Sequence, residues 1–199
     1  IGYGKDHEVD SLLNVIYNSP KDSNTVHLAL KISDKLQFKS LDYTIRFAKE
    51  SLLISEQLQW IYGMGRSNEK IGRAYWNLGK YDSALYYHFR ALNDYKKGKY
   101  WKNYWDIVVM IGQDYANSSQ FNLAIQYLNI ALNAYKKENN IGGVAYTSGI
   151  LSWVYSSKGD YVKSSEMILE QIKISEKKGD TLSMAFSYFS LANVYLNLK

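Results

Sequence analysis

One short motif occurs in four copies along this chain, at a fixed spacing of 40 residues. It joins a large aliphatic residue and a small residue to a tyrosine three positions later. The copies are Ile71-Gly72-x-x-Tyr75, Ile111-Gly112-x-x-Tyr115, Leu151-Ser152-x-x-Tyr155 and Leu191-Ala192-x-x-Tyr195. A period of this size is the signature of stacked repeat units, which each bury one face against the next. The chain is therefore predicted to be a repeat array rather than one or two ordinary globular domains.

A second element follows each motif in the same phase. Its copies are Gly79-Lys-Tyr81-x-x-Ala84-x-x-Tyr87, Ser119-Gln-Phe121-x-x-Ala124-x-x-Tyr127 and Gly159-Asp-Tyr161-x-x-Ser164-x-x-Met167. Apolar residues at three-and-four spacing in both elements indicate amphipathic helices. Each unit is thus predicted to be two antiparallel helices, A and B. Helix B is expected to run to a lysine pair and to stop at Gly98, Asn139-Asn140 or Gly179.

Small residues stand at the centre of each predicted helix A. Glycine inside a helix costs about 1 kcal/mol relative to alanine, so its presence needs a packing reason. Gly72, Gly112 and Ser152 indicate places where a neighbouring helix comes too close for a larger side chain. The matching small residues on helix B are expected to be Ala84, Ala124 and Ser164.

The composition agrees with long helices and excludes several classes of protein. Pro20 is the single proline among 199 residues, and proline interrupts helices. There is no cysteine, which excludes a disulfide scaffold, a zinc finger and a thiol nucleophile. The longest clean apolar stretch, Ile107 to Ile111, is too short to cross a bilayer.

The repeated pattern resembles the tetratricopeptide repeat (TPR). The residues that carry the resemblance are Gly72, Tyr75, Gly79, Tyr81, Ala84, Tyr87 and Ala91-Leu92. The resemblance implies an all-α fold, a right-handed α-solenoid of antiparallel helix pairs. The period departs from the usual value of about 34 residues, which implies longer helices or longer turns. The proline that usually follows helix B in the family is missing from every repeat.

This resemblance also sets the expected organisation of the chain. Residues 1–20 are predicted to form an N-terminal leader or capping helix, and 21–199 the TPR array. The expected repeats are approximately 25–64, 65–104, 105–144 and 145–184, with a half repeat at 185–199.

In such an array the A helices line a concave wall, and the resemblance implies that this wall binds a protein or peptide. The expected binding residues are Arg66, Glu69, Arg73, Trp76, Asn77, Asp106, Gln113, Asn117, Tyr146, Trp153, Phe189 and Asn193, with Phe186 beside them. Amides pair with a ligand backbone, and exposed aromatic side chains supply contact area. The alternative is that the aromatic residues pack against neighbouring helices.

Other kinds of function find little support. His7, His27 and His88 share no common spacing, so we expect no metal site, no cofactor and no catalytic activity in this chain. Lysines at helix ends complement the helix dipole, which accounts for much of the net charge of +5. Lys96, Lys97, Lys99 and Lys102 lie among aromatic residues, but nucleic-acid binding is not expected.

The whole chain resembles the N-terminal extracytoplasmic TPR sensor region of bacterial histidine kinases and helix-turn-helix regulators. The leader Val9 to Ile16 and the turn at 136–145 carry this likeness. It implies a periplasmic sensor domain, with any membrane contact or kinase domain outside this chain. The first residue is Ile1, so we expect a piece of a longer protein. The alternatives are a cytoplasmic scaffold and a signalling-peptide-binding regulator, and a homodimer stays open for each.

Overall fold

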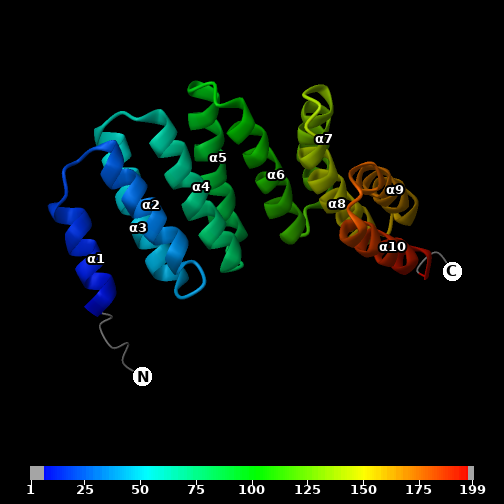
Figure 1. Ribbon diagram of the computed structural model, residues 1–199, viewed down its shortest axis with the longest axis horizontal. Helices are drawn as coiled ribbons and strands as arrows, with labels where there is room; N and C mark the ends of the chain where they lie inside the picture. Colours follow the sequence, from blue (N-terminus) through cyan, green and yellow to red (C-terminus); the bar gives the residue numbers. More distant parts are fainter. Residues whose placement is uncertain (1–6, 197–199) are drawn as a thin grey trace. The chain divides into compact units, whose positions relative to one another are not determined.

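The computed structural model describes residues 7–196, which form ten α-helices and no β-strand (Figure 1). The helices are α1 (His7–Asn18), α2 (Ser23–Leu36), α3 (Leu41–Gln57), α4 (Ile61–Asn77), α5 (Tyr81–Lys97), α6 (Trp101–Asn117), α7 (Phe121–Lys137), α8 (Ile141–Ser157), α9 (Tyr161–Lys178) and α10 (Thr181–Leu196). The all-α prediction is confirmed for this part of the chain. None of these helices is both long and apolar enough to cross a membrane.

The chain divides into two compact units, residues 1–107 and 108–199, and the division falls inside α6. In the first unit α2 packs on α3, α3 on α4 and α4 on α5. In the second unit α7 packs on α8, α8 on α9 and α9 on α10. Each unit is therefore built from consecutive helices that pack in chain order, as a helical repeat requires.

Short turns of one kind join the helices from α3 onward. Each turn holds one residue with a positive φ, and these residues recur every 20 positions: Gln59, Gly79, Lys99, Ser119, Asn139, Gly159 and Gly179. The next backbone N–H bonds back to a carbonyl five residues earlier, as from Lys80 to Tyr75 at 3.0 Å. This is the Schellman arrangement, which satisfies carbonyls at the end of a helix. The 40-residue period thus comes from helices of mostly 17 residues, rather than from long turns.

Helix α5 ends at Lys97 with Gly98 as its C-cap, as expected. Gly98 itself has φ −82°, however, and the left-handed conformation falls on Lys99, with φ 59°. Gly98 is small for another reason. A Cβ there would lie 2.2 Å from Cε2 of Tyr100 and 3.2 Å from Cγ2 of Ile61. Gly98 is therefore needed for close packing, and Lys99 is the residue with the positive φ.

The small residues of the A helices do lie at close helix contacts, as predicted. A Cβ on Gly72 would lie 2.4 Å from Cδ2 of His88, and one on Gly112 would lie 2.7 Å from Cγ of Leu128. The expected small partners lie at the same contacts, since the Cβ on Gly112 would also lie 3.5 Å from the carbonyl oxygen of Ala124, and Ser164 Oγ donates to the carbonyl of Ser152 at 2.8 Å. The nearest side chain, however, is one turn further along helix B. A large side chain on helix B fills the hollow that the glycine leaves.

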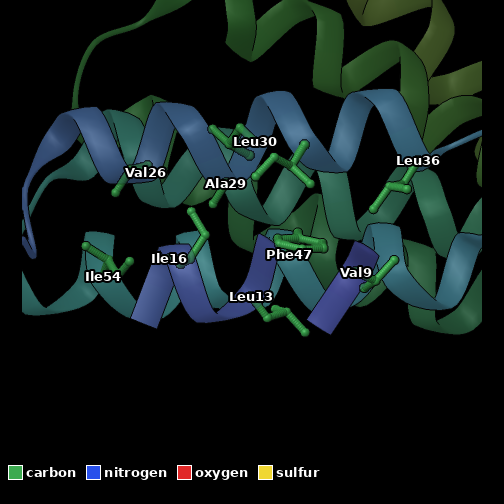
Figure 2. Packing of buried hydrophobic residues seen from close by; sticks show 10 residues of the cluster. Val9, Leu13, Ile16, Val26, Ala29, Leu30, Leu36, Phe47 and Ile54 are labelled. Carbon is green, nitrogen blue, oxygen red and sulfur yellow. The ribbon is translucent and has the colours of Figure 1, made fainter. Parts of the chain in front are cut away.

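The first helix pair keeps the same contact with different chemistry. Ser33 Oγ on α2 donates to the carbonyl of Thr44 on α3 at 2.9 Å, so a hydroxyl pairs with the backbone at the close approach. Helix α1 covers this pair with Val9, Leu13 and Ile16, which are all buried with Phe47 (Figure 2). The expected capping helix accordingly packs its apolar face on α2 and α3, while residues 1–6 of the predicted leader lie outside the described residues.

The contact between α6 and α7 makes a stability prediction. Gly112→Leu would force a side chain into the space that Leu128 occupies, so the free energy of unfolding should fall by about 1–3 kcal/mol or more. Chemical denaturation followed by circular dichroism measures the change. Gly142→Leu is the matched control, because Gly142 is exposed and the new Cβ would lie 3.7 Å from Oδ1 of Asn140, an ordinary van der Waals contact. Equal stability of the two variants would contradict the assigned contact.

Candidate functional site

The carboxylate of Glu69 on α4 contacts three side chains: Arg66 and Arg73 of the same helix and Tyr95 of α5. We call these four residues the Glu69 cluster. Arg66 Nη1 donates to both oxygens of Glu69, at 3.2 and 3.1 Å. Arg73 Nη2 lies 3.5 Å from Glu69 Oε1, and the Tyr95 hydroxyl donates to Glu69 Oε2 at 2.7 Å. Three residues that the sequence placed on the concave wall are thus brought together, and Glu69 orients both arginines.

Tyr95 reaches this cluster from α5 because Gly65 leaves room for its ring. A Cβ on Gly65 would lie 2.7 Å from Cε1 of Tyr95, and the tyrosine itself is fully buried. Burial, reinforced by the Glu69 carboxylate, raises the pKa of Tyr95 well above its ordinary value. The hydroxyl therefore stays protonated and keeps its role as a donor. Tyr95 is not among the binding residues that the sequence predicts.

The other predicted residues of the first unit occupy varied positions. Trp76 is half-buried, and its indole Nε1 is enclosed without a hydrogen-bond partner among the described residues. Asn77 is exposed at the end of α4, and Asp106 is half-buried on α6.

In the second unit, a cavity of about 670 Å³ that is open to solvent lies between α8, α9 and α10. We call it the α8–α10 groove. Its lining includes Tyr146, Gly149 and Trp153 of α8, Ile168 and Gln171 of α9, and Phe186 and Asn193 of α10. Tyr146, Trp153 and Phe186 remain 59%, 47% and 64% exposed, so large aromatic surfaces border an open space. Solvent-exposed aromatic side chains around a concavity are typical of a ligand-binding surface.

The groove is almost free of charge. Among its lining residues only Lys178 and Asp180 are charged, and serines supply much of the remaining polar surface. Asp180 is already engaged, because its two oxygens accept from Ser183 N at 3.0 Å and Ser183 Oγ at 2.7 Å. These hydrogen bonds lower the pKa of Asp180 and hold its carboxylate as a cap on α10.

The structure places the predicted residues of the second unit in two groups. Tyr146, Trp153 and Asn193 line the groove. Phe189 is 67% exposed on α10 but does not belong to the lining. On α6, Gln113 Nε2 donates to the Tyr146 hydroxyl at 3.2 Å, and Asn117 Nδ2 donates to the carbonyl of Gln113 at 2.8 Å. The amide of Asn117 is therefore used within its own helix.

The repeat pattern does not predict the contribution of α9 to the groove. Projection of the repeat pattern assigned only A-helix residues to the wall, whereas Ile168 and Gln171 of helix B also line the groove. A signal for Gln171 does exist in the sequence, because Ala91 and Ala131 stand at the equivalent positions of the other B helices.

The histidines take structural positions where they are described. His88 is buried against Gly72, and the ring of His27 meets Trp60 edge-on with centroids 5.2 Å apart. The side chain of His7 lies outside the described part. Within residues that the structure describes, no group of three or more histidine, aspartate or glutamate side chains could hold a metal ion.

The Glu69 cluster predicts a loss of stability in Tyr95→Phe. Losing a hydrogen bond to a charged group should lower the free energy of unfolding by about 1.5–3 kcal/mol at pH 7. Because the folded-state pKa of Tyr95 is raised, its stabilising effect is present below the unfolded-state pKa of about 10 and is lost as pH rises above it. The difference between wild type and variant should therefore shrink above that pH in urea-unfolding experiments.

Tyr86→Phe serves as the control, since Tyr86 is 58% exposed and its hydroxyl has no hydrogen-bond partner among the described residues. Equal effects of the two substitutions at pH 7 would show that the Tyr95 hydroxyl does not stabilise the cluster.

Comparison with known proteins gives a consistent fold. No family model and no curated protein matches the chain. Aspartyl phosphate phosphatase F from Bacillus subtilis matches 92% of this chain with a TM-score of 0.79 and 15% identity. A Rap protein complexed with competence and sporulation factor matches 94% with a TM-score of 0.76 and 13% identity.

A third match is a signal transduction ATPase with numerous domains from Pyrococcus horikoshii, which has a tetratricopeptide repeat sensor. It covers 94% of this chain with a TM-score of 0.81 and 14% identity. The chain spans only 52%, 56% and 29% of these three proteins, respectively. At such low identity the likeness concerns the fold, and it agrees with the repeated sequence pattern. The chain therefore has the fold of the tetratricopeptide-repeat proteins.

Proposed function

We propose that this chain is a protein- or peptide-binding module and that the α8–α10 groove receives the ligand. The observation that carries the proposal is the cavity of about 670 Å³ bordered by three exposed aromatic side chains, Tyr146, Trp153 and Phe186. Leaving such apolar surface in water is unfavourable, and a ligand that covers it would recover that free energy.

The chemistry of the groove favours a peptide segment over a charged small molecule. Aromatic side chains offer large contact area at low entropic cost, and they are enriched at the centres of protein interfaces. The polar side chains in the lining are mainly hydroxyls and amides, which can pair with the backbone of a peptide. The nearly neutral lining offers no cluster of cations or anions to a highly charged ligand.

We also propose that this binding module is the sensor domain of a bacterial signal-transduction protein, either a two-component histidine kinase or a helix-turn-helix transcriptional regulator, placed in the periplasm. The support is the sequence resemblance at Val9 to Ile16 and 136–145, together with a structural neighbour that has a tetratricopeptide repeat sensor. Ligand binding at α8 and α10 would then alter helix packing and pass a signal onward.

A signalling-peptide-binding regulator is the second candidate. The specific observation in its favour is the likeness to a Rap protein complexed with competence and sporulation factor. Protease accessibility of the natural protein in spheroplasts separates the two. Digestion of this region without cell lysis supports the periplasmic sensor, whereas protection until lysis supports the cytoplasmic regulator or scaffold.

The groove makes a direct binding prediction for Trp153→Ala. A peptide is first selected from a random library on the wild-type chain. Its affinity for the variant should be at least about tenfold lower, because a central aromatic contact is lost. Isothermal titration calorimetry measures the affinity, and thermal unfolding checks that the fold persists. Trp101→Ala is the matched control, since Trp101 is 49% exposed and lies in the other unit.

Equal binding by Trp153→Ala and the wild type would refute the groove assignment. Unfolding of Trp153→Ala would instead mark the tryptophan as part of the core, which its exposed fraction of 47% does not predict.

A further inference from the structure

The helix pair α8–α9 departs from the other repeats at two facing positions. On helix A, Glu69 and Val109 are replaced by Gly149. On helix B, Ala91 and Ala131 are replaced by Gln171. A side chain is thus lost on one helix, and a long amide is gained on the other.

The structure shows that these two changes fit each other. A Cβ on Gly149 would lie 2.4 Å from Nε2 of Gln171, so the amide occupies the space that a larger residue on α8 would take. From there Gln171 Nε2 donates a hydrogen bond to the carbonyl of Ala145 at 3.0 Å. Ala145 lies on α8, the same helix as Gly149. The glutamine of α9 therefore reaches across onto α8.

This hydrogen bond fixes the orientation of the amide. A backbone carbonyl only accepts, so the nitrogen of Gln171 must face Ala145. The oxygen, Oε1, accepts no hydrogen bond from the described residues, and Gln171 belongs to the lining of the α8–α10 groove. Oε1 of Gln171 is consequently a hydrogen-bond acceptor of fixed orientation in the groove. Trp153 belongs to the same lining.

We infer that Gln171 is a specificity-determining residue. Its Oε1 accepts a hydrogen bond from a backbone N–H of a bound, uncharged peptide segment. This inference rests on the proposed function of the groove and names the chemistry that the groove reads. An acceptor held in place loses little entropy on binding, and a ligand that lacks the matching donor would leave it buried and unpaired. Lys178 and Asp180 are the only charged residues of the lining, and the Asp180 carboxylate already accepts two hydrogen bonds from Ser183, so the groove offers few charges to a ligand.

The experiment uses a peptide selected from a random library on the wild-type chain, and measures its affinity for four variants. Gln171→Ala restores the residue of the other repeats, and Gly149→Ala displaces the amide without removing it. Both should weaken binding about tenfold, whereas the control Gln126→Ala should stay within about twofold of wild type. Gln126 is exposed on α7 and does not line the groove, so its removal tests the loss of a glutamine side chain outside the site. Trp153→Ala is the fourth variant.

Trp153→Ala separates this inference from the proposed function. Weak binding by Trp153→Ala with normal binding by Gln171→Ala would overturn the role of Gln171 and leave the groove as the ligand site. Normal binding by both variants would overturn the inference and the proposed function together.

A scan of backbone N-methylation in the same peptide tests the hydrogen bond from the ligand side. One N-methyl position should weaken binding to the wild type but add no further loss in Gln171→Ala, as expected of a coupled pair. If no N-methyl position weakens binding to the wild type, the inference is overturned, whatever the stability of the protein variants. Raising the salt concentration should leave the affinity within about twofold, and a strong salt dependence would contradict an uncharged ligand.

Discussion

The close contact between helix A and helix B is the constraint on which the described repeats depend. At Gly72 and Gly112 the backbone of helix A lies against a large side chain of helix B, with no room for a Cβ. The contact sets both the distance between paired helices and their rotation about their own axes. Once that rotation is fixed, other residues of each A helix stay exposed, such as Arg73 on α4 in one unit and Trp153 on α8 in the other.

Much of the fold could be predicted from sequence because these contacts recur in phase. The small residues and the tyrosines mark the packed face. The rings of Tyr75 and Tyr87 stack with centroids 5.5 Å apart, and those of Tyr115 and Tyr127 lie at the same distance with their planes tilted by 30°. The conformation of Lys99 could not be predicted in this way. Glycine is the usual residue for a positive φ, and only the position of the Tyr100 ring shows that Gly98 is needed for space.

The candidate site was predictable only in part, for a related reason. A helical projection tells which residues share a face, and three residues that it assigned to one face, Tyr146, Trp153 and Asn193, lie in one lining. It does not tell which side chains reach over from a neighbouring helix. Tyr95 arrives at Glu69 from α5, and Gln171 arrives at Ala145 from α9, and both depend on a glycine in the facing helix.

The central claim is that the α8–α10 groove receives a peptide, and nuclear magnetic resonance tests it most directly. An isotope-labelled chain is titrated with a peptide selected from a random library, with the indole signals assigned through Trp153→Phe and Trp101→Phe. The account predicts that the Trp153 indole and the side-chain amide of Gln171 shift in step with binding, while the Trp101 indole stays in place. Shifts at Trp101 with unchanged signals from Trp153 and Gln171 would contradict it.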